Sequence, residues 1–230
     1  RVENAGGLRP QPGYPPGLAA DPPRLSRTQG NPMRHRHSEK LRFIGQWLKN
    51  PRQTAAVAPS SPELAAAMLA EMPADTRRVI ELGGGTGALT RAIVSHGITG
   101  DALLVLELNE ELHAHLHRRF PDELLVLGDA AELPRLAAEA GFLDAGPADA
   151  VISGLGLLAM DRELVTRILR AAFGCLRPDG RFIQFTYGPV SAVSDAVLDV
   201  LGLRMRRGEF VLRNVPPATV YVYERATPGA

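Results

Sequence analysis

The chain has a single cysteine and no long apolar run, and these two shortages exclude several classes of protein. Cys175 on its own excludes an intramolecular disulfide and a cysteine-rich zinc site, and it is typical of a reducing cytoplasm. No apolar stretch approaches the roughly 20 residues that a membrane-spanning helix needs. The first residues also lack the pattern of a secretory signal peptide. We therefore expect a soluble or membrane-peripheral protein, cytoplasmic and on the inner face of the cytoplasmic membrane if peripheral, with no metal site.

The charge is divided unevenly along the chain. Residues 1–52 hold ten Lys and Arg against three acids, a formal charge of +7, whereas the remaining 16 basic and 22 acidic residues give −6. A basic leader on an acidic body indicates that the leader meets something anionic. RNA and anionic lipid are both compatible with this pattern.

The leader itself has two parts. Residues 1–33 are rich in proline and glycine and poor in apolar residues, so we expect them to be disordered. Residues 34–53 predict an amphipathic basic helix, either docked on the domain or lying at a membrane interface. We favour the interface, with Arg42, Phe43, Trp47 and Leu48 in contact with an anionic membrane surface.

Residues 54–230 predict one α/β domain in which strands alternate with helices. At 230 residues and 45% hydrophobic, the chain is long enough to bury one substantial core. We expect strands at 79–82, 102–108, 124–127, 150–153, 181–186, 204–212 and 218–224. We expect helices at about 60–72, with a capping box formed by Ser60 and Glu63, and at 88–95, 110–119, 132–140, 161–175 and 190–201. This order is typical of a doubly wound, mostly parallel sheet whose last two strands form an antiparallel hairpin.

A glycine-rich turn follows the first predicted strand. Gly83, Gly85 and Gly87 supply a turn at which a ligand can approach the backbone closely. The spacing from Gly83 to Ala88 also fits the dinucleotide fingerprint, so the glycines alone leave the ligand open. Glu81, two residues before the turn, would repel a pyrophosphate and attract a cation. This carboxylate favours S-adenosylmethionine (SAM), which carries a sulfonium and an ammonium, over NAD.

Two further acids end the second and third predicted strands. Glu107 lies 24 residues after Gly83, near the spacing at which an acid accepts the ribose hydroxyls. Asp129 is placed to accept the exocyclic amine of adenine, and Ala130 offers a backbone N–H. Because parallel strands end at one edge of a sheet, three acids in register match one extended adenosyl ligand.

Four motifs resemble a known family: Ala56-Val-Ala-Pro-Ser-Ser61, Glu81-Leu-Gly-Gly-Gly-Thr-Gly87, Val151-Ile-Ser-Gly-Leu155 and Gln184-Phe-Thr-Tyr-Gly-Pro189. They are similar to those of the bacterial phospholipid N-methyltransferases, which belong to the class I SAM-dependent methyltransferases and convert phosphatidylethanolamine stepwise to phosphatidylcholine. The resemblance implies a Rossmann-like seven-stranded fold and SAM as the cofactor. One departure is Gly156, where the family usually has proline.

The resemblance and the positions of residues along the chain together suggest the residues of the site. Its implied cofactor-binding residues are Glu81, Gly83, Gly85, Thr86, Gly87, Glu107, Leu108, Asp129, Ala130 and Ser153. Gly154 and Leu155 would surround the target amine through backbone carbonyls, and Tyr187 would offer an aromatic face to the developing ammonium. Ser60 and Ser61 precede the first core strand, where a lid over the substrate could lie. Arg42, Arg52 and Arg207 all remain candidates for the head-group phosphate.

The related rRNA adenine dimethyltransferases suggest an alternative. Those enzymes end the same loop with an aromatic residue that stacks on a flipped base, whereas this chain has Gly154, Leu155, Gly156 and Leu157 there. The missing aromatic favours a small aliphatic amine. We therefore expect a monomeric phosphatidylethanolamine N-methyltransferase that binds no DNA, and RNA only under the alternative. A degenerate SAM-binding accessory protein is the non-enzymatic reading.

Overall fold

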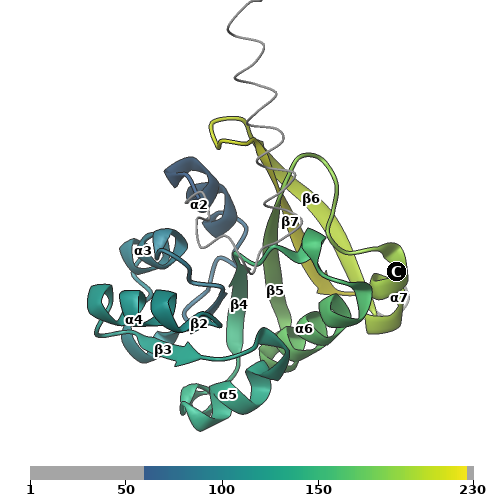
Figure 1. The fold of residues 1–230 in the computed structure, drawn as a ribbon. Helices are drawn as coiled ribbons and strands as arrows, with labels where there is room; N and C mark the ends of the chain where they lie inside the picture. Colours follow the sequence, from purple (N-terminus) through teal and green to yellow (C-terminus); the bar gives the residue numbers. More distant parts are fainter. Residues whose placement is uncertain (1–59, 227–230) are drawn as a thin grey trace, which may run out of the picture. The chain divides into compact units, whose positions relative to one another are not determined.

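A computed structural model describes residues 60–226, and within them the chain forms one seven-stranded sheet with helices on both faces (Figure 1). The strands are β1 (Val79–Leu82), β2 (Leu103–Glu107), β3 (Leu124–Leu127), β4 (Ala148–Ser153), β5 (Leu176–Tyr187), β6 (Leu203–Val211) and β7 (Ala218–Arg225). The α-helices are α2 (Pro62–Leu69), α3 (Ala88–Ser95), α4 (Glu110–Arg119), α5 (Leu133–Glu139), α6 (Arg162–Cys175) and α7 (Asp195–Leu201). Short 3₁₀ turns lie at Gly100–Ala102, Ala130–Glu132, Phe142–Ala145 and Leu157–Ala159.

The strand order is β3-β2-β1-β4-β5-β7-β6, in which β7 alone runs opposite to the other strands. Strands β1 to β5 are parallel, and the order reverses between β1 and β4, where the chain crosses from one half of the sheet to the other. Ligands of such sheets lie beyond the carboxyl ends of the strands at this switch point. The predicted Rossmann-like sheet with an antiparallel C-terminal hairpin is therefore confirmed.

Each face of the sheet buries its own apolar cluster. One cluster joins the sheet to α2, α3 and α4 through residues such as Leu64, Ile93 and Leu116, and the other joins it to α5, α6 and α7 through Leu136, Ile168 and Val197 (Figure 1). Strands β1 and β2 are buried along their whole length because helices cover both faces. The central strands are therefore held rigidly, and the loops at their carboxyl ends are positioned by them.

Local sequence signals set the helix boundaries. Asn109 begins α4, its side chain accepting hydrogen bonds from the backbone N–H groups of Glu111 and Leu112 at 3.0 Å each. Asp161 caps α6 in the same way, accepting from Leu164 N–H at 2.8 Å. Helix α4 also carries acids in its first turn and basic residues in its last, which complements the helix dipole.

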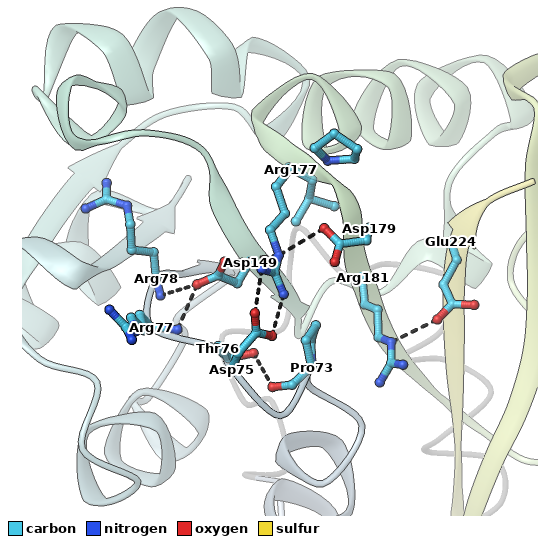
Figure 2. Close-up of polar contacts among 12 residues, drawn as sticks. Pro73, Asp75, Thr76, Arg77, Arg78, Asp149, Arg177, Asp179, Arg181 and Glu224 are labelled. Carbon is cyan, nitrogen blue, oxygen red and sulfur yellow. Dashed lines mark hydrogen bonds and ion pairs between the residues drawn. The ribbon is translucent and has the colours of Figure 1, made fainter. Parts of the chain in front are cut away.

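Ion pairs gather at the amino ends of the strands, on the edge of the sheet opposite the glycine turn. Arg177 at the start of β5 pairs with Asp75, Asp149 and Asp179, with N–O distances of 2.6, 3.1 and 3.2 Å (Figure 2). Asp149 also accepts hydrogen bonds from the backbone N–H groups of Arg77 and Arg78 at 2.7 and 2.8 Å. The three carboxylates hold the pKa of Arg177 above its ordinary value. This Arg177 cluster ties the starts of β1, β4 and β5 to one another.

Three predicted boundaries are wrong. Ser61, rather than Ser60, caps α2, because Pro62 occupies the first turn and the Ser61 hydroxyl accepts from Leu64 N–H at 3.1 Å. Residues 190–194 are not helical, so α7 begins only at Asp195. The turn at residues 178–180 lies inside β5, where the pairing with β4 shifts its register between Ala148 and Ala150.

The predicted leader (1–33) and basic helix (34–53), with Arg42, Phe43, Trp47 and Leu48, lie outside the described residues. Within residues 60–226, no helix is long and apolar enough to cross a membrane. The same part of the chain holds no group of three or more His, Cys, Asp or Glu placed to bind a metal ion.

Candidate active site

The candidate site is built on the carboxyl ends of β1, β2, β3 and β4, and the glycine turn after β1 is its centre. Gly83, Gly85 and Gly87 have φ of +77°, +54° and +81°, a region that strongly favours glycine. A Cβ at Gly87 would also lie 2.5 Å from Cε2 of Phe120. At Gly85 an added Cβ would meet nothing nearer than 3.9 Å apart from its chain neighbours, so this side of the turn is open. The turn is therefore packed against Phe120 at Gly87 and open at Gly85, which leaves room for a ligand.

Glu107, at the end of β2, holds the glycine turn in place. One carboxylate oxygen accepts a hydrogen bond from Gly85 N–H at 2.8 Å, and the other accepts from Asn109 N–H at 2.9 Å. The side chain is 7% exposed. Each oxygen of a carboxylate has two lone pairs, so each one keeps an acceptor position. Glu107 can therefore bind a ligand hydroxyl pair while it fixes the turn, a double role that the sequence did not indicate.

Glu81 lies in the middle of β1 and is fully buried on the side of the sheet that α3 covers. Neither of its carboxylate oxygens has a hydrogen-bond partner within residues 60–226. Burial raises the pKa of Glu81 to about 8, and the charge of Glu107 adds to the rise. A buried carboxyl with no hydrogen-bond partner beneath a ligand-binding turn is suited to a cationic ligand, which would restore its charge.

The ends of β2 and β3 supply the other predicted cofactor contacts. Asp129 accepts from Ala131 N–H at 2.9 Å through one oxygen, and it begins the short turn that contains Ala130. Leu108, directly after Glu107, is 62% exposed although it is a large apolar side chain. Gly128 N–H donates to the carbonyl of Glu107 at 3.0 Å, so the ends of β2 and β3 are held side by side. An acceptor, a backbone turn and an apolar surface suited to adenine are thus adjacent.

The loop after β4 packs against the glycine turn. A Cβ at Gly83 would lie 2.9 Å from Cδ2 of Leu155, and one at Gly154 would lie 3.0 Å from the carbonyl oxygen of Gly83. The hydroxyl of Ser153, which is fully buried, makes a long contact of 3.4 Å with Leu155 N–H. The structure therefore brings together the predicted cofactor residue Gly83 and the predicted acceptor residues Gly154 and Leu155.

Gln184 is the residue that the sequence reasoning missed. This fully buried side chain on β5 pairs in register with Ser153 and donates from Nε2 to the carbonyl oxygen of Leu155 at 2.9 Å. Leu157 N–H donates to the same oxygen, also at 2.9 Å. Both lone pairs of the Leu155 carbonyl are thus in use. The signal that could have identified Gln184 is a polar side chain buried level with Ser153, the last residue of β4.

Tyr187 ends β5, three residues beyond Gln184, and its half-buried ring faces the side of the sheet that α2 and α3 cover. Its ring meets Phe185 edge to face, with centroids 5.4 Å apart and planes at 72°. Burial raises the pKa of the Tyr187 hydroxyl above its ordinary value. The ring is therefore oriented by packing against Phe185 on that face of the sheet.

Ser60 and Thr86 line a cavity of about 850 Å³ between α2 and α3. The small side chains of both helices line this cavity, together with Arg91 and Arg119. Ser61 is occupied as a helix cap, and its backbone N–H donates to Asn214 at 3.0 Å. Ser61 therefore has a structural role as the cap of α2, whereas Ser60 lines the cavity, and a role of either serine in a lid stays a prediction.

These features fit SAM as the bound cofactor. The open side of Gly85 admits a ligand, the Glu81 carboxyl has no hydrogen-bond partner in the described part of the chain, and Leu108 presents an uncovered apolar surface. Glu107 and Asp129 keep acceptor positions on neighbouring strands.

Comparisons with known proteins agree with this site. The family model described as a methyltransferase domain matches residues 80–184, from β1 to β5. An ornithine lipid N-methyltransferase of Singulisphaera acidiphila is 31% identical over 189 residues, which cover 78% of this chain and 92% of that protein. A ribosomal RNA small subunit methyltransferase A of a Synechococcus species is 36% identical over 100 residues, which cover 41% of this chain and 32% of that protein.

Solved structures share the fold. The CcbJ methyltransferase from Streptomyces caelestis superposes with a TM-score of 0.54 at 18% identity, covering 71% of this chain and 89% of that one. A TehB-like SAM-dependent methyltransferase from Corynebacterium glutamicum gives a TM-score of 0.52 at 14% identity, covering 82% and 99%. At these identities the likeness shows the fold alone.

Proposed function

Because this chain belongs to the class I SAM-dependent methyltransferases, in one family with an ornithine lipid N-methyltransferase, we propose that it methylates the amine of phosphatidylethanolamine and of its mono- and dimethyl forms, towards phosphatidylcholine. The membrane surface is where such a substrate resides, so the proposed enzyme is peripheral and works there on single lipid molecules. The observation that carries the proposal is the 31% identity to a lipid N-methyltransferase across 92% of its length.

The loop after β4 supports an aliphatic amine over a nucleobase. Leu157 stands where the rRNA enzymes carry their stacking aromatic, and its side chain is 1% exposed within the apolar cluster under α6. Neither Gly154 nor Gly156 offers a side-chain acceptor or an aromatic face. A flipped base would therefore find nothing to stack on at this loop, whereas a small amine needs only carbonyl oxygens.

The chain's own residues would mainly position the acceptor. Bound SAM supplies an electrophilic methyl group, and the amine must present its lone pair in line with it, so positioning carries most of the rate. The Leu155 carbonyl already accepts two hydrogen bonds, so we assign the amine to the carbonyl of Gly154 instead. Gln184 fixes the loop by holding Leu155. Tyr187 offers its ring face to the ammonium as positive charge develops.

Transfer of labelled methyl groups from SAM to defined acceptors tests the proposal. The full chain would be given vesicles of phosphatidylethanolamine, its mono- and dimethyl forms, ornithine lipid, or a ribosomal RNA transcript. We expect labelled phosphatidylcholine to accumulate from the first three lipids. Labelling of ornithine lipid alone would replace the phospholipid with that acceptor.

The second candidate is RNA methylation, which the match to a ribosomal RNA methyltransferase over 41% of the chain favours. Labelling of the transcript, with none of the lipids labelled, would establish it. An absence of labelling in every arm, with SAM bound, would leave the SAM-binding accessory reading.

A further inference from the structure

The tip of the β6–β7 hairpin exposes an unusual set of side chains. Leu212 and Val215 in the connecting loop are 70% and 72% exposed, Phe210 at the end of β6 is 42% exposed, and Val190 in the loop after β5 is 64% exposed. Arg207 and Arg213 accompany them, and neither forms an ion pair within residues 60–226. We define the hairpin patch as Val190, Arg207, Phe210, Leu212, Arg213 and Val215.

A register shift in β6 brings part of this patch onto one face. Arg207 pairs with Tyr221 and Phe210 pairs with Thr219, so β6 has one residue more than β7 between these pairs. Directly paired residues share a face of the sheet, so Arg207 and Phe210 point the same way. The guanidinium carbon of Arg207 lies 6.0 Å from the centre of the Phe210 ring. A cation and an aromatic ring are thus presented together beside one acid of the same strand, Glu209.

The backbone that carries the patch is anchored on both sides. Thr219 donates to the Gly188 carbonyl at 2.6 Å, and the Tyr221 hydroxyl donates to the Pro189 carbonyl at 2.6 Å, which fixes the loop before Val190. In the connecting loop, Asn214 is 2% exposed and donates to the carbonyl of Pro216 at 2.7 Å. The apolar side chains are therefore exposed from a fixed backbone, a state that costs free energy unless something covers them.

The patch lies at the substrate edge of the sheet. Tyr187 pairs with Ala218, and Ala218 pairs with Val211, so the hairpin connection begins at the level of the predicted acceptor residue. Asn214 also accepts from Ser61 N–H at 3.0 Å, which places the start of the described chain beside the tip. Residue 53, the end of the predicted interfacial helix, is seven residues from Ser60, a reach of at most about 25 Å.

We propose that the hairpin patch is a second membrane contact, which inserts Leu212 and Val215 among lipid head groups while Arg207 and Arg213 meet anionic lipids. The proposal rests on the proposed lipid methyltransferase function. Apolar side chains beside cations on a fixed tip match an anionic bilayer surface, in which one end of the patch is buried and the other pairs with phosphates. Its position level with Tyr187 along the strands would turn the end of the sheet that carries the proposed site towards the lipid layer.

A fluorophore at the tip tests the contact directly. Cys175 is 1% exposed and burial raises its pKa to about 11, so it stays unreactive at neutral pH and an introduced cysteine is labelled alone. The full-length Val215→Cys variant would carry an environment-sensitive dye, with Val200→Cys as the matched control. Val200 is 69% exposed but lies just before Leu203, at the opposite end of β6, roughly 25–30 Å away.

Vesicles containing phosphatidylglycerol should shift the emission of the dye at residue 215 to the blue and leave that at residue 200 unchanged. An unchanged dye at residue 215 on a vesicle-bound protein would overturn the proposal. So would a shift that follows protein concentration without vesicles, which indicates a second copy of the chain, or one that RNA produces in their place.

Vesicle affinity gives a second measurement. The Leu212→Ser/Val215→Ser variant should bind about ten-fold more weakly than the parent, and Arg213→Gln about five-fold more weakly at low salt, following roughly 1 kcal/mol per cation near an anionic surface. Val200→Ser and Arg170→Gln, exposed positions away from the tip, should bind as the parent does. Equal affinity of the tip and control variants would overturn the proposal.

Activity separates this proposal from the one it rests on. Turnover of short-chain, monomeric phosphatidylethanolamine needs no bilayer, so the tip variants should match the parent there. Loss of that turnover in the parent itself contradicts the proposed function, whereas the dye and affinity results judge the hairpin patch alone.

Discussion

At Glu81, ionisation of the side chain lowers the stability of the folded protein. Its pKa of about 8 in the folded protein exceeds the ordinary value of 4.5, so the folded state binds the proton more tightly than the unfolded state does. Stability is therefore highest below pH 4.5 with respect to this group, and it falls as the pH rises towards about 8. We infer that a cationic ligand, when it binds, offsets the loss of stability that ionisation of Glu81 causes.

Replacing Glu81 with glutamine should remove that cost together with the affinity it supports. Without SAM, Glu81→Gln should be more stable than the parent at pH 8 by up to a few kcal/mol, and the difference should shrink as the pH falls. Urea unfolding across this range measures it. The parent's affinity for SAM should rise from pH 6 to pH 8 as its carboxyl ionises, whereas the variant's should follow only the ligand. Parallel pH profiles for both proteins would contradict a contact between Glu81 and SAM.

Two substitutions at Tyr187 distinguish the contribution of its ring face from that of its hydroxyl. Tyr187→Phe keeps the edge-to-face contact with Phe185 and the proposed aromatic face, so it should retain appreciable turnover. Tyr187→Ala loses the face and should slow methyl transfer more, by about 10-fold for a contact of 1–2 kcal/mol. Initial rates with saturating SAM measure this, and S-adenosylhomocysteine affinity, unchanged in both variants, is the control. Wild-type turnover in Tyr187→Ala would remove Tyr187 from the site.

At the scale of the element, Glu107 links the end of β2 to the glycine turn through a hydrogen bond. Glu107→Ala leaves the N–H groups of Gly85 and Asn109 without acceptors and removes the proposed ribose contact. We expect S-adenosylhomocysteine to bind more weakly by about 1–3 kcal/mol. Glu107→Gln should lose nearly as much, because an amide has one acceptor oxygen for two donors. Calorimetry measures both.

NAD serves as the control ligand in that calorimetry. The parent should bind S-adenosylhomocysteine and not NAD, because the buried Glu81 carboxyl is matched to a cationic group of the ligand and, once ionised, would repel a pyrophosphate. If NAD binds and S-adenosylhomocysteine does not, the cofactor assignment is wrong.

The elements also show which features could be predicted from the sequence and which could not. Gly83, Gly85 and Gly87 were predictable because a turn with positive φ leaves a signature in composition, and Asn109 and Asp161 were predictable as caps because capping is local. Glu107, Asp129 and Glu81 could be placed at or near strand ends from periodicity alone.

Contacts between distant segments left no such signature. The bond from Gln184 to Leu155 depends on the register of β5 against β4, which no local pattern encodes. Asn214 and Ser61 are 153 residues apart in sequence. The choice of Ser61 over Ser60 as cap was also missed, because both serines satisfy the local pattern and the position of Pro62 decides between them.

At the scale of the whole molecule, membrane binding is expected to need both the leader and the hairpin patch. Stable attachment to a bilayer generally takes two signals, since one weak contact is readily reversible. Deleting residues 1–50 should therefore lower binding to phosphatidylglycerol vesicles below detection while the circular dichroism of the domain is preserved. In the full chain, emission from Trp47, its only tryptophan, should shift to the blue on vesicles, more strongly at low salt.

A fixed Trp47 emission, together with steeply salt-dependent binding to RNA, would transfer the role of the leader to RNA. Retained vesicle binding after the deletion would instead assign attachment to the described domain.

The Arg177 cluster bears on how this domain can change over evolutionary time. It links the starts of β1, β4 and β5 through Asp149, at the edge of the sheet farthest from the acceptor loops (Figure 2). Mutations in the loops after β4 and β5 therefore leave these links intact, and we expect strand register to be independent of the amine that these proposed acceptor loops receive. Such a division lets acceptor preference drift between lipid head groups without a stabilising mutation at each step, and it marks residues 154–159 and 188–194 as the segments to randomise in selecting a methyltransferase for a new amine.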